Sequence, residues 1–197
     1  HSFQLYANCF FLILFAICIA TGYYLNGKSF KGYGELIRDT GHQSDFAAKY
    51  SMPVCLINIG LVGTFFLLYL DVIMVYTEGV GFTGATIGVV LAAMTFTCMG
   101  QHPGNIWPIL AGYQLLYFVT MFLCHINGRE MSWTITTQGY INGVAFATGL
   151  CPIAGRYGRR AGIAAGFMCA SMCTATSALH GGLVLYNGGF TTGITAL

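Results

Sequence analysis

Charged side chains are scarce in this sequence: of 197 residues, only eight are Lys or Arg and six are Asp or Glu, which is 7% of the chain. A typical soluble domain carries about 25% charged residues, because charged side chains line its water-exposed surface. Basic clusters are missing apart from residues 156–160, and the net charge is only +2, so no nucleic-acid partner is expected. Since 56% of the residues are hydrophobic and 27 are Gly, the composition predicts a polytopic integral membrane protein.

The sequence also lacks the residue constellations of an enzyme. No C-x-x-C spacing occurs, and the adjacent pair Cys124-His125 would point apart on a helix. Cys169, Cys173 and His180 could share one helix face, but thiols in apolar sequence are more typical of packing than of a metal site. We therefore expect no catalytic residues, no metal and no cofactor, and we expect the eight Cys to be buried free thiols.

Apolar segments of about 20 residues, the length that crosses a hydrocarbon core, are abundant. They predict an all-α membrane bundle with about five to seven passes, in one transmembrane domain that covers residues 1–197. Because the chain starts at His1 and stops inside an apolar segment at Leu197, we expect it to be part of a longer protein. The segments are residues 5–25, 53–76, 82–99, 105–125, 135–154, 161–179 and 183–197.

Residues 26–50 form a polar, amphipathic loop between the first two segments. On a seven-pass topology, seven Lys and Arg fall on the side of this loop and only Arg129 falls on the other. Positive residues in short loops mark the cytoplasmic side of a membrane protein. The sequence therefore predicts a cytoplasmic loop and an N-terminus outside. The seven residues are Lys28, Lys31, Arg38, Lys49, Arg156, Arg159 and Arg160.

Three Gly- and Thr-rich elements interrupt the apolar segments, at residues 81–84, 140–149 and 186–193. The last two share Tyr, Asn-Gly, Phe and Thr-Gly in the same order. Broken helices of this kind expose backbone groups, which in a membrane must be buried in protein or line a wet cavity. We expect re-entrant half-helices in which Asn142, Tyr186, Asn187 and Thr191 line a solute site, with close helix packing as the alternative.

The glycine row 158, 162 and 166 is, in contrast, typical of close helix packing. Two further recurrences suggest an internal repeat, but they give different offsets between its two copies. Met, His and Gly recur at an offset of 78 residues, from 94–104 to 172–182, whereas Gly-Phe-Thr recurs at an offset of 108 residues, from 81–83 to 189–191. An internal repeat is therefore an expectation whose register the sequence leaves open.

Three ionisable residues in or near apolar segments are candidate site residues. Asp71 stands well inside its segment, where a carboxylate needs an interior partner or water, so it is either a cation or proton site or a hydrated residue near the interface. His102 and His180 each end an apolar segment before a Gly. Each either contributes to a polar pathway or terminates a helix by hydrogen bonding to loop carbonyls.

Several stretches resemble an uncharacterised family of multi-spanning bacterial membrane proteins known as a domain of unknown function. The resemblance implies a bacterial inner-membrane location and no established activity. The stretches are GELIRD (34–39), LINIGL (56–61), GQHPGNIWP (100–108), TGLCPIA (148–154) and LHGGLVLYNGGF (179–190). A fainter likeness to urea transporters rests on the order of segments 81–88, 105–118 and 139–143, the last of which departs from Gly-Tyr-Asn-Gly by Ile141.

Together these features predict a channel or secondary transporter for a small polar solute. Its site would lie at the membrane midplane, where half-helix ends and Asn and Thr side chains replace the hydration shell of the solute. The alternative is a structural subunit or scaffold, in which Gly and Thr serve helix packing, and His and Asp contact a homo-oligomeric partner or another protein of a membrane complex.

Overall fold

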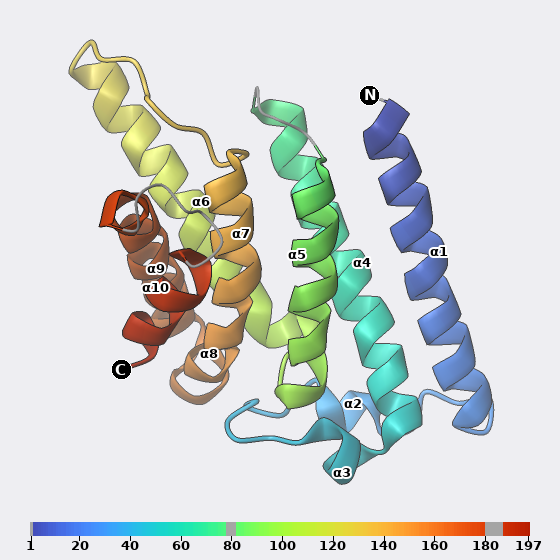
Figure 1. Ribbon diagram of the computed structural model, residues 1–197. Coiled ribbons are helices and arrows are strands. Elements are labelled where there is room, and N and C mark those ends of the chain that lie inside the picture. The colour runs from blue at the N-terminus through green and yellow to red at the C-terminus, as the bar shows by residue number, and fades with distance from the viewer. Residues whose placement is uncertain (1, 78–81, 180–186) are drawn as a thin grey trace.

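The computed structural model describes residues 2–77, 82–179 and 187–197, and every regular element in these ranges is a helix (Figure 1). Within these ranges, three helices are long and apolar enough to cross a membrane: α1 (Ser2–Leu25), α4 (Met52–Tyr76) and α6 (Pro103–Ile126). A shorter apolar helix combines α5 (Gly84–Thr95) with the 3₁₀ turn η1 (Phe96–Met99). These lengths are compatible with an integral membrane protein.

The remaining helices are shorter or less apolar. The predicted segment 135–154 is divided into α7 (Gln138–Ala147), the 3₁₀ turn η2 (Thr148–Leu150) and α8 (Cys151–Tyr157). They are followed by α9 (Arg159–Leu179) and by α10 (Asn187–Ala196). The interruption at η2 falls on the Thr-Gly pair that the sequence marked as a helix break.

Helix α1 lies at the edge of the bundle and packs antiparallel against α4 (Figure 1). Glycines allow the two backbones to approach: a Cβ on Gly60 would meet the Phe15 carbonyl oxygen, and a Cβ on Gly22 would meet the Pro53 carbonyl oxygen. The Gly22–Pro53 approach joins the end of α1 to the start of α4, and the Gly60–Phe15 approach lies nearer the middle of both helices. Packing by small residues is the usual way in which membrane helices associate.

Helix α9 packs in parallel against α6, again through glycine. A Cβ on Gly166 would meet the backbone of Ile109, and one on Gly112 would meet the carbonyl oxygen of Ile163. Gly162 approaches Pro108 and Ala154 in the same way. The predicted packing role is thus confirmed for Gly162 and Gly166, whereas Gly158 precedes α9 in open space with φ of +91°.

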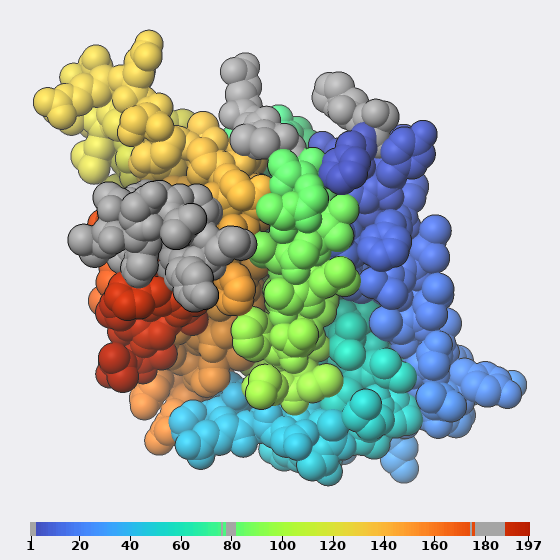
Figure 2. Space-filling model, in the orientation of Figure 1, coloured from blue at the N-terminus to red at the C-terminus, as the bar shows by residue number. Residues whose placement is uncertain are grey.

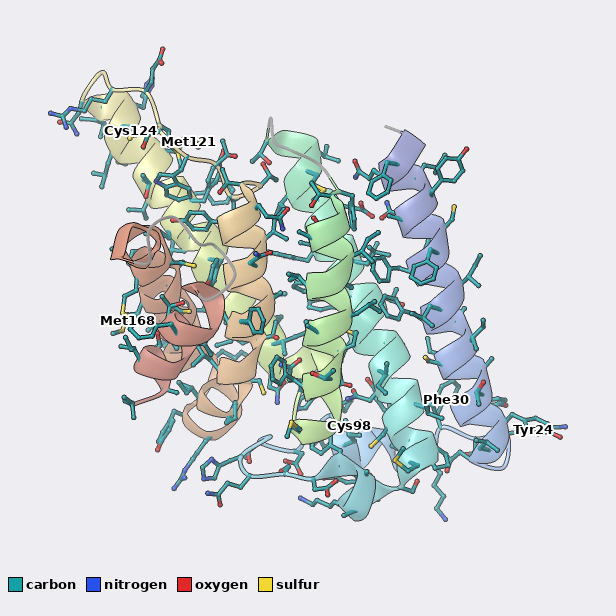
Figure 3. All side chains as sticks on the ribbon, viewed as in Figure 1. Tyr24, Phe30, Cys98, Met121, Cys124 and Met168 are labelled. Carbon is teal, nitrogen blue, oxygen red and sulfur yellow. The ribbon has the colours of Figure 1, made fainter. Side chains whose placement is uncertain are left out.

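The loop of residues 26–50 folds along one end of the bundle, which we call the loop end (Figures 1 and 2). It contains α2 (Tyr33–Leu36) and α3 (Phe46–Tyr50), whose side chains Leu36 and Phe46 bury against the start of α4. The thiol of Cys98, labelled in Figure 3, packs against the same cluster from η1.

The loop also contacts the break between η1 and α6, and the helix α8. Gly41 approaches Gly100, in the break between η1 and α6, so closely that a Cβ on either residue would overlap the backbone of the other. Gly155 of α8 makes an equally close approach to the backbone of Thr40. Residues 26–50 therefore form a packed part of the fold. They contact both the η1–α6 break and helix α8, which lie far away in the sequence.

Candidate functional site

Three short helices, α5, α7 and α10, run side by side towards the loop end, with α7 between the other two (Figure 1). Thr83 at the start of α5 donates a hydrogen bond to Gln138 at the start of α7 (2.7 Å). On the other side of α7, a Cβ on Gly188 of α10 would lie 2.9 Å from the Asn142 carbonyl oxygen. The three Gly- and Thr-rich elements of the sequence therefore meet in one layer.

Polar and aromatic side chains follow one face of α7. Gln138, Asn142 and Phe146 are spaced four residues apart, and side chains at this spacing lie above one another on a helix. Asn142 is buried, and its side-chain oxygen accepts a hydrogen bond from Gln138 (2.8 Å). One turn further along, Phe146 meets Phe96 of η1 edge to face, with ring centroids 6.3 Å apart. The face thus begins with amides and ends at an aromatic pair.

A cavity of about 370 Å³ opens beside this aromatic pair, towards the loop end. It lies where η2 interrupts the α7–α8 segment, and residues from η1, α7, η2, α8 and α10 surround it. Three of its nine lining residues are glycines, and because glycine has no side chain, they leave space in the cavity for a ligand. The lining residues are Phe96, Met99, Gln101, Phe146, Gly149, Cys151, Gly189, Thr192 and Gly193.

Buried polar groups surround the break between η1 and α6 that borders this cavity. Gln101 donates to the hydroxyl of Thr148 (2.9 Å), and its backbone carbonyl accepts from the amide of Asn58 (2.7 Å). The side-chain oxygens of Gln101 and Asn58 are buried and have no partner within the part of the chain that the structure describes. Because an unpaired buried acceptor is costly, these oxygens are candidates for hydrogen bonds to water or to a bound solute.

His102 is buried at the start of α6, and its Nε2 donates to the backbone carbonyl of Asp39 (2.8 Å). Its backbone N–H donates to the side chain of Asn105 (2.9 Å). These contacts correspond to the second alternative for this residue, a histidine at a helix end that binds a loop carbonyl. Burial lowers the pKa of His102 below its usual value, although the Asp39 carbonyl opposes that shift. The neutral imidazole therefore holds the loop against the helix break.

Asp71 lies elsewhere, at the interface of α4 with α1. Its carboxylate accepts two hydrogen bonds from Asn8 (2.9 and 3.0 Å) and one from Gln4 (3.2 Å). The carboxylate is half-buried and has interior amide partners. The structure therefore does not bring Asp71 together with Asn142, and places it one helix interface away from the α5–α7–α10 layer.

Thr191 is buried where α10 crosses α9, and it donates to the carbonyl of Gly188 (3.1 Å). The thiol of Cys169 lies 3.6 Å from its hydroxyl and 3.3 Å from the hydroxyl of Tyr113. This packed polar cluster stands behind the cavity, whereas the adjacent Thr192 lines the cavity itself. Within the described ranges, no three His, Cys, Asp or Glu side chains come together as a metal site would require.

Three further predicted site residues are not placed by the structure. His180 and Tyr186 lie outside the described residues, and Asn187 is described only as the first residue of the α10 backbone. The adjacent Gly188 nevertheless fixes where the second Asn-Gly element meets the first, because it approaches both the Asn142 carbonyl and the Gly143 Cα.

Two glycine spacings of nucleotide-binding proteins occur in the chain: Gly22 to Ser29 fits G-x-x-x-x-G-K-S, and residues 79–84 fit G-x-G-x-x-G. In nucleotide-binding folds each follows a strand and opens a helix whose N-terminus binds phosphate. Gly22 instead lies inside α1, packed on Pro53, and α1 ends three residues later. This first spacing therefore does not form a phosphate-binding loop, and the first half of the second, residues 79–81, lies outside the described residues.

Sequence reasoning missed the residues that build the cavity wall. Phe96 and Phe146 are ordinary members of apolar segments, so no local pattern distinguishes them from core aromatics. Gln138 had a usable signal, because it stands one helical turn before Asn142 and extends the same polar face. Gln101 also carried a sequence signal. It is a second polar residue next to His102 at a helix break, and a polar residue buried there needs hydrogen-bond partners.

The comparisons with known proteins identify a family but add no activity. No curated protein and no solved structure matches the chain, so neither comparison supports the fainter likeness to urea transporters. One family model matches residues 25–197, which includes all three elements of the α5–α7–α10 layer. The chain belongs to the family described as protein of unknown function DUF1576.

Proposed function

We propose that this protein is a channel or secondary transporter for a small polar solute, with its pathway along the α5–α7–α10 layer. The observation that carries the proposal is that two broken, Gly- and Thr-rich segments, 140–149 and 186–193, line one cavity, while Thr83 of the third segment bonds to the start of α7. Short helices that end inside a membrane are tolerated where they line a cavity or are buried in protein, and they build solute sites in many transporters.

The proposed pathway has a polar part, a constriction and a vestibule. Gln138 and Asn142 supply amide groups that exchange hydrogen bonds with a solute as it loses water. The Phe96–Phe146 pair forms the constriction, and the cavity of about 370 Å³ beyond it forms the vestibule. Since these groups are uncharged, they suit a neutral or singly charged polar solute better than a multivalent ion. Asp71 would act on a coupling cation only from the α1–α4 interface.

The same proposal places the chain in a bacterial inner membrane with five to seven passes. The long helices α1, α4 and α6 supply full-length passes, and α9 and the short helices supply the others. The loop of residues 26–50 would be cytoplasmic and the N-terminus outside, because the basic residues gather at the loop end.

Uptake into liposomes that contain the purified protein tests the proposed function. The panel includes urea, ammonium, small amino acids and protons, and the test variant is Thr192→Val, which removes a cavity hydroxyl at constant shape. Thr95→Val removes an exposed hydroxyl on α5 and serves as the matched control. We expect flux of one solute class, reduced several-fold by Thr192→Val and unchanged by Thr95→Val. Equal flux with both variants would remove the cavity from the pathway.

The scaffold alternative predicts the opposite result in the same uptake experiment. A structural subunit would give no flux for any solute in the panel, although the protein is folded and inserted. The Thr192→Val variant would then show its effect, if any, in the recovery of a co-purifying membrane complex.

A further inference from the structure

A second cavity, of about 290 Å³, lies at the loop end on the other side of η2 from the proposed vestibule. Its wall is apolar and consists of Leu150, Pro152 and Ile153, with Ala196 of α10 opposite. Its rim is polar and consists of His42 from the loop with Arg156 and Tyr157 from α8. The cavity is therefore amphipathic, with an aliphatic interior and a basic edge.

Among the residues that the structure describes, no carboxylate pairs with this basic edge. The one salt bridge within the described ranges joins Lys49 to Asp39, and the polar partner recorded for the Arg156 guanidinium is the His42 ring, 3.1 Å away. A guanidinium can only donate, so the Nε2 of His42 accepts and the neutral ring keeps its proton on Nδ1. The positive charge of Arg156 is thus uncompensated, and the His42 Nδ1–H remains as a second donor.

The position of the cavity along the bundle adds to the argument. Arg159, three residues after Arg156, lies over the ring of Trp107 at the start of α6, with 5.7 Å between the guanidinium carbon and the ring centroid. Trp and Arg at the ends of apolar helices are typical of the level at which lipid headgroups lie. Basic pockets between membrane helices at this level bind acidic headgroups.

We propose that this cavity binds one acidic phospholipid. The phosphate oxygens would accept hydrogen bonds from Arg156 and His42, and the start of an acyl chain would lie against Leu150, Pro152 and Ile153. The apolar wall favours a lipid over free phosphate, because a small anion leaves that wall without a partner. The site is distinct from the proposed solute pathway, and it adjoins that pathway through Gly149, which lines both cavities.

Native mass spectrometry of the purified chain in mild detergent tests the proposal. The probes are phosphatidylglycerol and phosphatidylcholine with matched acyl chains, and inorganic phosphate in a separate series. We expect the wild type to retain one phosphatidylglycerol in preference to phosphatidylcholine, and Arg156→Gln to weaken that binding about tenfold. Arg156 is exposed, so the variant removes charge without opening the core.

Two further variants separate a built site from a merely basic surface. Lys28→Gln removes one exposed positive charge at the same end and should leave lipid binding within about twofold of wild type. Ala196→Trp keeps the charge but fills the cavity mouth, and should weaken binding as Arg156→Gln does. Equal losses in Lys28→Gln and Arg156→Gln, full binding by Ala196→Trp, or displacement of the lipid by millimolar phosphate would each overturn the proposal.

Discussion

The carboxylate of Asp39 organises the loop end through hydrogen bonds from four groups. It accepts from the N–H of Gly41 (2.8 Å), from the hydroxyls of Ser44 (2.8 Å) and Tyr50 (2.7 Å), and from the ammonium of Lys49. Burial alone would raise the pKa of Asp39, but these donors outweigh it and hold the pKa well below the usual range. One nearly buried side chain therefore fixes a loop that the helix breaks pack against.

Replacing Asp39 with Asn should destabilise the folded protein by about 2 kcal/mol, because hydrogen bonds to a charged acceptor contribute roughly 1.5–3 kcal/mol. Asp45→Asn is the matched control: it keeps an oxygen that can cap α3 and removes the same charge from the same loop. Thermal unfolding in detergent measures the difference. In the wild type, the contribution of Asp39 is present above about pH 4 and is lost only as the pH falls towards its lowered pKa. Equal melting temperatures for the two variants would contradict this role.

His102 should give the protein a second pH dependence, nearer neutrality. Its pKa is lowered by burial, so the folded state binds its proton less readily than the unfolded state, whose histidine titrates near 6.5. Stability is therefore full above about pH 6.5 and decreases as the pH falls from there towards the lowered pKa. The melting temperature of His102→Gln should change less between pH 7.5 and 5.5 than that of the wild type. His125→Gln, at the exposed end of α6, should keep the wild-type dependence.

At the scale of elements, the contact between α7 and α10 depends on a glycine. A Cβ on Gly188 would lie 2.9 Å from the Asn142 carbonyl oxygen and 3.1 Å from the Gly143 Cα, both of which are backbone atoms that cannot turn aside. Gly188→Ala should therefore destabilise the protein by roughly 1–3 kcal/mol. The neighbouring Gly189 has no atom within 4 Å of its Cβ position, so Gly189→Ala should be neutral or slightly stabilising. A similar loss in both variants would contradict the contact as the cause, because only Gly188 approaches α7 closely and Ala is the better helix former at both positions.

The long helices could be predicted from the sequence because an uninterrupted apolar run is a local signal, which does not depend on residues elsewhere in the chain. Residues 5–25 and 105–125 differ from α1 and α6 by no more than three residues at either end. The segment 135–154 carried a local sign of its division at η2, the Thr-Gly pair, but the partner of Thr148, Gln101, lies 47 residues earlier and could not be predicted. The cavity was unpredictable for the same reason, since its wall joins residues from five elements.

The candidate site residues could likewise be identified from local sequence, but their partners could not. Asn142 was identified because an amide inside an apolar segment is locally conspicuous, and the structure gives it a half-buried partner, Gln138. Asp71 was equally conspicuous, but its partners Asn8 and Gln4 come from the helix at the edge of the bundle. Sequence identifies polar residues that need partners, and only the arrangement of helices shows which of them share a site.

At the scale of the whole molecule, the two ends of the bundle differ in charge. The loop end carries the basic residues of segments 26–50 and 156–160, which lie far apart in the sequence and meet through the hydrogen bond between His42 and Arg156. The opposite end, where α6 terminates, carries Arg129 and Glu130. Because this asymmetry arises from two independent segments, it supports one orientation of the bundle more strongly than either segment would alone.

Cysteine labelling should therefore place the two ends on opposite sides of the membrane. Ala48→Cys lies exposed on α3 at the loop end, and Ser132→Cys lies exposed beyond the end of α6. In intact bacterial cells, a membrane-impermeant maleimide should label Ser132→Cys but not Ala48→Cys. In inside-out vesicles the two variants should exchange behaviour, and the wild type with its eight native thiols gives the background in both preparations. Labelling of both variants from one side would mean that α6 does not cross the membrane, and the reversed pattern would place residues 26–50 outside.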